Sequence, residues 1–240
     1  MSDSFAIEAR ALNVEVGGKP VLKELSVGFR AAQVTAIVGP NGAGKTTLLK
    51  ALLRLLPLAS GQVHLAGQDI SARQAHQLAG RIGYLEQAPN IYWPLSVEAL
   101  VTLGLPAAAA ARAGALEAAL ERTEIAEFRH RPVLELSGGE RALVLLARVL
   151  ATEAPVILAD EPTLSLDPRH QIAILECFRR QAKAGTCVVL VMHDLLMAEK
   201  YADRIVVLDR GGLYKDLTMP LGLDDQTLED VFGIGRAALA

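Results

Sequence analysis

Apolar and polar residues alternate along two segments near the start of the chain, residues 5–16 and 23–30. This alternation is typical of antiparallel strands that bury one face, and residues 17–20 between them supply the glycines and proline of a turn. An antiparallel β region is therefore predicted at the start of the chain. Apolar runs predict three further strands, at residues 34–38, 61–65 and 81–85.

A different pattern begins at residue 137, where helical and strand-like segments alternate. Helical patterns cover residues 137–152 and 168–183, and strand-like apolar runs cover residues 156–159 and 186–191. Such alternation is typical of a parallel sheet covered by helices on its faces. A hairpin and a last short helix are predicted beyond it, at residues 205–208, 212–214 and 228–232.

Residues 94–131 interrupt this pattern with a stretch rich in Ala and Leu. Helix signals occur at residues 96–98 and across 107–123, and helix propensity explains the alanine run at 107–111. We therefore predict an α/β protein with a helical insertion. Its parts are a core with the β subdomain at about residues 5–87 and 137–218, a helical subdomain at 88–136 and a C-terminal tail at 219–240.

Composition and charge limit the functions that fit this chain. The 240 residues carry a net charge of −3 without a conspicuous basic tract, so nucleic acid is not an expected partner. Mean hydropathy is +0.30, but Arg148 and Pro155 interrupt the most apolar stretch, which disfavours a membrane span. The first residues lack the features of a secretory signal. Cys177 and Cys187 lack metal-site spacing and are expected to be buried thiols in a reducing compartment.

Candidate chemistry begins with the segment from Gly39 to Thr46, which fits the phosphate-binding (P-loop) pattern Gly-x-x-x-x-Gly-Lys-Ser/Thr. Its glycines let backbone N–H groups approach phosphate oxygens, and the helix predicted at residues 46–56 places its positive end behind them. Lys45 is expected to reach the β- and γ-phosphates, and the Thr46 hydroxyl to bind Mg²⁺. A chance Gly-rich turn is the alternative, and the flanking strand and helix count against it. The predicted nucleotide-binding residues here are Gly39, Pro40, Asn41, Gly42, Ala43, Gly44, Lys45, Thr46 and Thr47.

A second group of candidates, Asp160 and Glu161, follows the apolar strand predicted at residues 156–159. The carboxyl end of such a strand faces the crevice in which α/β sheets bind ligands. Asp160 is expected to hold Mg²⁺, usually through water, and Glu161 to polarise the water that attacks the γ-phosphate. The alternative is a polar turn closed by Pro162, which the phosphate-binding loop upstream makes less favourable.

Residues 136–140, Leu-Ser-Gly-Gly-Glu, carry both a structural and a functional signal. Ser137 followed three residues later by Glu140 is a capping box for the helix that begins here. A capping box needs no glycine, and glycine in a first helical turn costs stability relative to alanine. Gly138 and Gly139 leave N–H groups open to an anion, so a second phosphate-binding surface is predicted at this helix start.

The order of these motifs resembles that of the nucleotide-binding subunits of ATP-binding cassette (ABC) transporters. The resemblance implies the ABC ATPase variant of the P-loop NTPase fold, with a mixed or parallel core sheet, an N-terminal antiparallel β subdomain and a helical insertion subdomain. It implies an ATPase whose hydrolysis of ATP drives transport across a membrane. The motifs that carry it are the P-loop, Gln87, residues 136–140, Asp160-Glu161, residues 165–167 and His193.

The resemblance also implies roles for individual residues in a head-to-tail dimer of two copies that enclose two ATP molecules. The P-loop of one copy would meet Ser137 and Gly139 of the other at the γ-phosphate, and Asp167 would lie in the loop that crosses between the copies. Glu161 resembles the family's general base. His193 resembles its γ-phosphate contact, and Gln87 resembles its contact with Mg²⁺ and the attacking water.

Partners and location follow from the same resemblance. It implies integral membrane permease subunits, reached through the segment around Gln87 and the helical insertion, and indirectly a solute-binding protein. The location it implies is the cytoplasmic face of the cell membrane. Residues 136–151, 201–204 and 231–234 are similar to importers of iron–siderophore complexes, haem or cobalamin, whereas residues 94–98 are also similar to zinc and manganese importers. A soluble ABC ATPase acting on nucleic acid or ribosomes is a further alternative, and a P-loop kinase is disfavoured by residues 136–140.

One position departs from the family pattern. The family usually places an adenine-stacking aromatic residue upstream of the P-loop, where this chain has Val16. Val16 can pack against the base without stacking, so weaker base selectivity is expected. The histidines other than His193 have no motif around them and are expected at the surface: His64, His76, His130 and His170.

Overall fold

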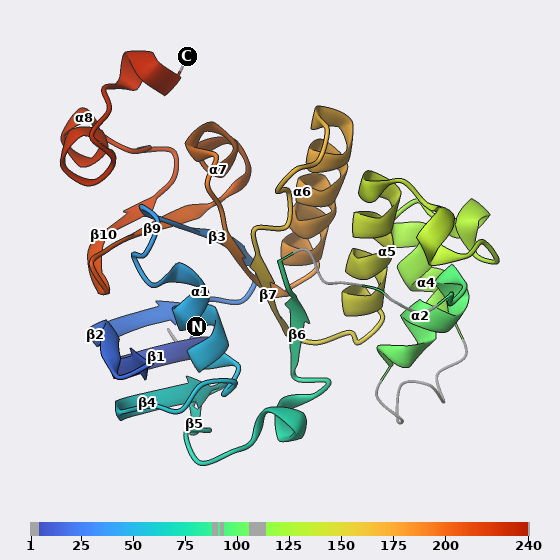
Figure 1. The fold of residues 1–240 in the computed structure, drawn as a ribbon, viewed down its shortest axis with the longest axis horizontal. Helices are drawn as coiled ribbons and strands as arrows, with labels where there is room; N and C mark the ends of the chain where they lie inside the picture. The colour runs from blue at the N-terminus through green and yellow to red at the C-terminus, as the bar shows by residue number, and fades with distance from the viewer. Residues whose placement is uncertain (1–4, 88–90, 92–93, 106–113, 240) are drawn as a thin grey trace.

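The centre of the computed structural model, which describes residues 5–87, 91, 94–105 and 114–239, is a six-stranded sheet (Figure 1). Its strand order is β10-β9-β3-β8-β7-β6. Neighbouring strands are parallel except β9 and β10, which form the predicted closing hairpin. The sheet is therefore mixed. Its strands are β3 (Gln33–Val38), β6 (Ile82–Leu85), β7 (Val156–Asp160), β8 (Cys187–Val191), β9 (Arg204–Asp209) and β10 (Gly212–Thr218).

A second sheet is antiparallel and has the order β2-β1-β4-β5. Gly17 and Gly18 alone make the turn between β1 and β2, and both have positive φ, +59° and +73°. This conformation matches the twist of a two-residue hairpin. Lys19 and Pro20 belong to β2, so the predicted four-residue turn is too long. The strands are β1 (Ile7–Val16), β2 (Lys19–Phe29), β4 (Ser60–Leu65) and β5 (Gln68–Asp69), the last of which was not predicted.

Helices cover both faces of the central sheet. Figure 1 shows α1 between the two sheets, α6 and α7 on the opposite face, and α5 beside β6 with α2 and α4 on its outer side. The helices are α1 (Lys45–Leu52), α2 (Val97–Leu103), α4 (Ala115–Arg122), α5 (Gly138–Leu150), α6 (Pro168–Lys183), α7 (Leu195–Tyr201) and α8 (Asp225–Thr227). Short helical turns are η1 (Ala75–Leu78), η2 (Ala126–Phe128), η3 (Val133–Glu135), η4 (Leu228–Phe232) and η5 (Arg236–Leu239).

Two helices differ from the predicted ranges. α1 ends at Leu52 instead of residue 56, because Arg54 has a positive φ of +58°, a conformation that ends helices. Within the helix predicted at residues 107–123, α4 begins at Ala115, and the alanine run at 107–111 lies outside the described residues. α7 has no counterpart among the predicted helices.

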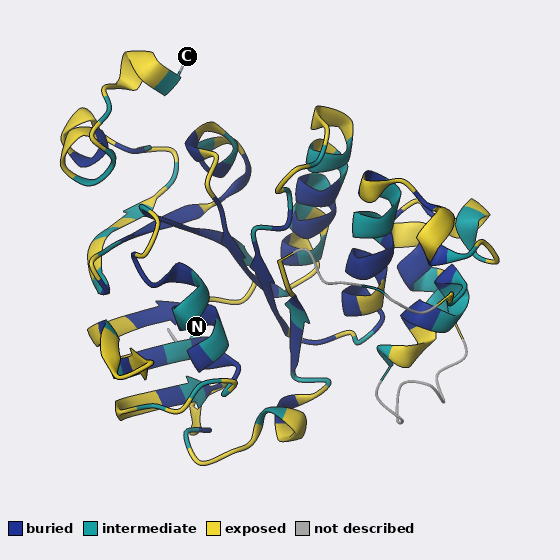
Figure 2. Cartoon of the chain, in the orientation of Figure 1, coloured by how far each residue is buried: buried dark blue, intermediate teal, exposed yellow. Residues whose placement is uncertain are grey.

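Alternate residues of the central strands face two apolar clusters. In β8, Val188 and Leu190 face the cluster shared with α5, α6 and α7, whereas Val189 and Val191 face the cluster shared with α1 and the antiparallel sheet. Every residue of β7 and β8 is buried, and Figure 2 shows the central strands dark blue along most of their length. Side chains at the ends of these strands are therefore carried by a tightly packed support.

Two expectations from composition concern the cysteines and the apolar stretches of the chain. Cys177 and Cys187 are buried free thiols, as predicted. Within residues 5–87, 91, 94–105 and 114–239, no helix has the length and apolar character needed to cross a membrane. The α/β organisation with an antiparallel N-terminal region is confirmed. The subdomain boundaries stay a prediction.

Candidate active site

The predicted catalytic residues gather at one edge of the central sheet. Lys45 follows β3, Gln87 follows β6, Glu161 follows β7 and His193 follows β8. These strands are parallel, so their carboxyl ends meet at the same edge. The topology therefore brings together residues that are up to 148 positions apart in the chain.

The P-loop depends on glycine at two positions where another residue would clash. Gly39 has φ +153°, and a Cβ there would lie 2.2 Å from the carbonyl oxygen of Leu208. Gly44 has φ +98° and caps α1, and its Cβ would lie 2.6 Å from the side chain of Leu22. Both neighbours belong to other strands, so the loop is packed tightly between β9 and β2. This fixes its backbone at the start of α1.

Lys45 is a buried cation inside its own loop. Its side chain Nζ donates hydrogen bonds to the carbonyl oxygens of Gly39, at 2.7 Å, and Pro40, at 3.0 Å. Burial lowers the pKa of Lys45, and the nearby carboxylates of Glu161 and Asp160 oppose that effect. Phosphate oxygens arriving in the loop can replace the two carbonyls as partners of this ammonium group.

Thr46 and Asp160 place two oxygen donors side by side. The Thr46 hydroxyl donates to Asp160 Oδ1 at 3.1 Å, and Asp160 is 1% exposed. Burial raises the pKa of Asp160, the charge of Glu161 raises it further, and the hydrogen bond from Thr46 opposes both. Burial disfavours the charged form of Asp160, and a bound cation would favour that form. A hydroxyl and a carboxylate are oxygen ligands of the kind that Mg²⁺ prefers. Thr47 lies next to them in the first turn of α1 and is half-buried.

Glu161 is held from two sides. One carboxylate oxygen, Oε1, lies 2.5 Å from Nε2 of His193, and the other accepts a hydrogen bond from Nε2 of Gln87 at 2.8 Å. The backbone N–H of Glu161 donates to the carbonyl of Val191, and its φ is +49°. A positive φ is uncommon for glutamate and turns its side chain away from the strand direction. The carboxylate is thereby fixed where a general base is expected.

The Leu-Ser-Gly-Gly-Glu segment forms the predicted capping box. Ser137 Oγ accepts from the N–H of Glu140 at 3.3 Å, and Glu140 Oε2 accepts from the N–H of Ser137 at 2.7 Å. Gly138 is exposed, and a Cβ there would meet nothing within 4 Å. Ser137 therefore bonds within its own turn, whereas Lys45 bonds within the P-loop. The two predicted phosphate-binding surfaces do not bond to each other through these groups.

Asp167 caps α6, and its carboxylate binds the backbone N–H of His170 at 3.1 Å. The expectation that His64 and His170 lie at the surface is wrong, since their side chains are only 12% and 21% exposed. His64 lies near Glu8 in the antiparallel sheet, and His170 contacts Asp167 with its ring. The spacing of Asp at the cap and His three residues later was the signal available in the sequence.

Val16 lies at the end of β1, next to the Gly17-Gly18 turn, and is 47% exposed. Leu22 and Val21 of the same hairpin approach Gly44, so the hairpin lies against the P-loop side of α1. The exposed Val16 side chain can therefore pack against a flat group such as a nucleotide base. Such a contact relies on dispersion, without aromatic stacking.

Comparison with known proteins assigns the family. The family model described as ABC transporter matches residues 22–164. The chain belongs to the ABC transporter family. This ABC transporter protein is 49% identical over 208 residues to "Hemin import ATP-binding protein HmuV" of Streptomyces coelicolor, covering 85% of this chain and 74% of the relative. It is 40% identical over 240 residues to the protein of the same name from Bradyrhizobium diazoefficiens, covering 96% and 90%. A solved dimeric bacterial ABC transporter cassette is 25% identical with a TM-score of 0.78, covering 89% of this chain and 98% of that chain.

These findings confirm the family, the ABC ATPase fold and the importer branch to which the sequence is similar. The protein is an ATP-binding member of an ABC system, and its enzymatic class is ATPase. The roles of its individual site residues stay predictions.

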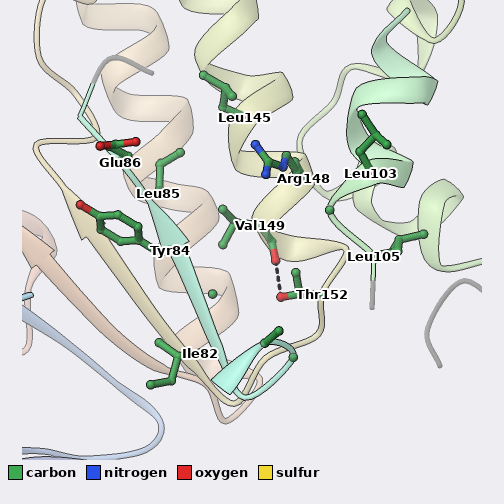
Figure 3. A pocket seen from close by; sticks show the side chains of 14 residues that line it. Ile82, Tyr84, Leu85, Glu86, Leu103, Leu105, Leu145, Arg148, Val149 and Thr152 are labelled. Atoms are coloured by element: carbon green, nitrogen blue, oxygen red, sulfur yellow. Dashed lines mark hydrogen bonds between the residues drawn. The ribbon is translucent and has the colours of Figure 1, made fainter. Parts of the chain in front are cut away.

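The ABC protein also has a cleft of about 430 Å³ beside the candidate active site (Figure 3). Strand β6, with Leu85, and Glu86 directly after it form one wall, and α5, with Leu145 and Arg148, forms the opposite wall. The end of α2 contributes Leu103, which is 67% exposed. The cleft joins exposed apolar surface to two opposite charges, and its β6 wall leads directly into Gln87.

Proposed function

We propose that the chain is the ATP-hydrolysing subunit of a membrane importer for haem or a chemically similar iron chelate. The relatives named hemin import ATP-binding protein support this solute class. The observation that carries the ATPase mechanism is the position of Glu161, held between Gln87 and His193 at the sheet edge that also bears Lys45. A fixed carboxylate beside a phosphate-binding loop is the arrangement that hydrolysis of a nucleoside triphosphate requires.

In this proposal the chain's own groups divide the work of hydrolysis. Lys45 leaves the carbonyls of Gly39 and Pro40 to bind the β- and γ-phosphates of ATP. Thr46 and Asp160 would hold Mg²⁺, which would supply positive charge to the phosphates. Glu161 accepts a proton from the attacking water, while His193 orients Glu161 and contacts the γ-phosphate.

The proposed working unit is a head-to-tail dimer. Ser137 and Gly138 are exposed at the start of α5, with Gly139 directly after them, and the Ser137 hydroxyl bonds only within its own turn, so this helix start is available to the nucleotide of a second copy. Asp167 belongs to the loop expected to cross between the copies. The dimeric cassette of similar fold supports this arrangement. Hydrolysis removes the bridging γ-phosphate, and the dimer then opens.

The proposed partners are integral permease subunits, with a solute-binding protein acting through them, at the cytoplasmic face of the membrane. The cleft between β6, α2 and α5 is the proposed docking site for a permease segment. Its apolar Leu103, together with Glu86 and Arg148, suits a short amphipathic helix. Movement of that segment reaches Gln87 directly, because Gln87 follows the β6 wall of the cleft.

Purification from native membranes tests this proposal. The tagged chain is expected to co-purify with polytopic permease subunits, and the reconstituted complex to hydrolyse ATP faster with a haem-loaded solute-binding protein than with the empty one. Leu103→Glu should reduce co-purification, whereas Leu221→Glu, at a position that is 83% exposed in the tail, should not. Stimulation by cobalamin, zinc or manganese instead of haem would contradict the proposed solute, and binding to ribosomes in place of permeases would contradict transport.

A further inference from the structure

His170 contacts two motifs that are about thirty residues apart in sequence, residues 136–140 and residues 165–167. It is the third residue of α6, directly after the loop that contains Asp167. Its ring reaches across to Gly139 at the start of α5. In the proposed dimer both motifs face the nucleotide of the second copy, so a group that fixes one against the other has a bearing on hydrolysis.

Asp167 binds both the backbone and the ring of His170. Its Oδ1 accepts from the backbone N–H at 3.1 Å, and its Oδ2 lies 2.7 Å from ring Nδ1. A carboxylate accepts hydrogen bonds, so Nδ1 carries the proton in this contact. These bonds lower the pKa of Asp167. The ring is thus held in one orientation at the base of the loop.

Gly139 lies directly against that ring. A Cβ at Gly139 would come within 2.3 Å of His170 Cγ and 2.4 Å of Nδ1, which no side chain tolerates without displacement. Gly139 is also buried, in contrast to Gly138. The structure therefore explains the second glycine of the motif by the approach of an aromatic ring, a reason separate from anion binding.

Charged groups surround the contact on the solvent side. A cleft of about 330 Å³ is lined by Ser137, Glu140, Arg169 and His170. The hydrogen bonds with Ser137 lower the pKa of Glu140, the other half of the capping box, and the nearby Arg131 and His170 lower it further. His170 therefore lies next to both components of the cap that sets the orientation of Ser137.

We propose that His170 is a positioning residue that fixes the start of α5, with Ser137 and Gly139, against the Asp167 loop of the same chain. The inference rests on the proposed function, because it assigns to these two motifs a shared task at the nucleotide of the second copy. His170 touches neither nucleotide nor Mg²⁺ in this role. It acts by making the two motifs move as one unit.

Steady-state hydrolysis by the full-length chain tests the proposal. His170→Leu removes the donor to Asp167 and should lower kcat for ATP about tenfold, because a hydrogen bond to a charged group is lost, with little change in KM. His170→Asn keeps a donor at the position of Nδ1 and should retain most of the parental kcat. His130→Leu is the matched control, since that side chain is 82% exposed and outside the site. Equal kcat for parent and His170→Leu, or equal losses for the Asn and Leu variants, would overturn the proposal.

A double substitution tests the path of the effect. If His170 acts through Asp167, combining Asp167→Asn with His170→Leu should lower kcat no further than the larger single effect, whereas independent effects would multiply. Multiplied losses would therefore contradict the proposed connection.

The outcome for Glu161→Gln separates this inference from the proposed function. If Glu161→Gln abolishes hydrolysis while His170→Leu matches the parent, the function stands and the positioning role is wrong. If Glu161→Gln hydrolyses ATP like the parent, the proposed function is wrong and the positioning role is contradicted with it.

Discussion

Glu161 Oε1 and His193 Nε2 lie 2.5 Å apart, although the two residues come from the ends of different strands, β7 and β8. Gln87 binds the second oxygen of the same carboxylate. Glu161 is 12% exposed in its side chain and His193 is 42% exposed. The carboxylate is thus largely enclosed, and the imidazole is the more accessible partner. A ligand arriving at the edge meets His193 first.

His193→Ala should lower kcat for ATP about a hundredfold, the size of effect typical of groups that take part in acid–base steps. Nucleotide affinity should change little, because Lys45 and the P-loop backbone lie on another element. Steady-state kinetics and equilibrium binding of a fluorescent ATP analogue measure the two effects. His76→Ala is the control, as His76 is exposed and lies away from this edge. Parental turnover in His193→Ala would contradict the role given to this contact.

Asp160→Asn should stabilise the nucleotide-free protein while abolishing hydrolysis. The pKa of Asp160 is raised by burial, so its contribution to stability is fully present below its unfolded pKa of about 3.9 and is lost as pH rises through the folded value. The gain in Tm should therefore be larger at pH 7 than near pH 4, at about 2–4 °C per kcal/mol for a chain of this size. Thermal unfolding at both pH values measures it. A lower Tm for Asp160→Asn at pH 7 would contradict the assignment.

Val16 predicts weak discrimination between bases. Because it offers dispersion without stacking, ATP and GTP should be hydrolysed at comparable kcat/KM. Val16→Tyr should raise the preference for ATP about fivefold, in line with the energy of one aromatic pair. Leu213→Tyr, at another exposed apolar position, is the control and should leave the ratio unchanged. A strict preference for ATP in the parent would show that another residue reads the base.

Much of this site was predictable because its signals are local in sequence. The P-loop pattern that ends at Lys45 and Thr46, and an acidic pair after an apolar strand, can each be recognised within a short stretch of sequence. The capping box at Ser137 and Glu140 follows from spacing alone, and the structure contains it. The sheet edge at which these residues meet follows from the alternation of helices and strands.

The rest depended on tertiary contacts that no local pattern reports. His170 has no motif around it. Its proposed positioning role is visible only from the contact between its ring and Gly139, which tertiary packing creates. The reason for Gly39 lies in the carbonyl of Leu208, a residue of a distant strand. α7 is a short helix of seven residues capped by Asp194, and so brief a segment gives little periodicity to detect.

In the proposed mechanism this chain works as a dimer that ATP closes and hydrolysis at Glu161 opens. The most direct test is the mass of Glu161→Gln in the presence of Mg²⁺ and ATP, measured by size-exclusion chromatography with light scattering. We expect a stable species of twice the 25.5 kDa chain mass, which reverts to the single-chain mass when Lys45→Ala is added. A Glu161→Gln protein that stays at the single-chain mass with ATP, or that hydrolyses ATP at the parental rate, would contradict the proposed dimer mechanism.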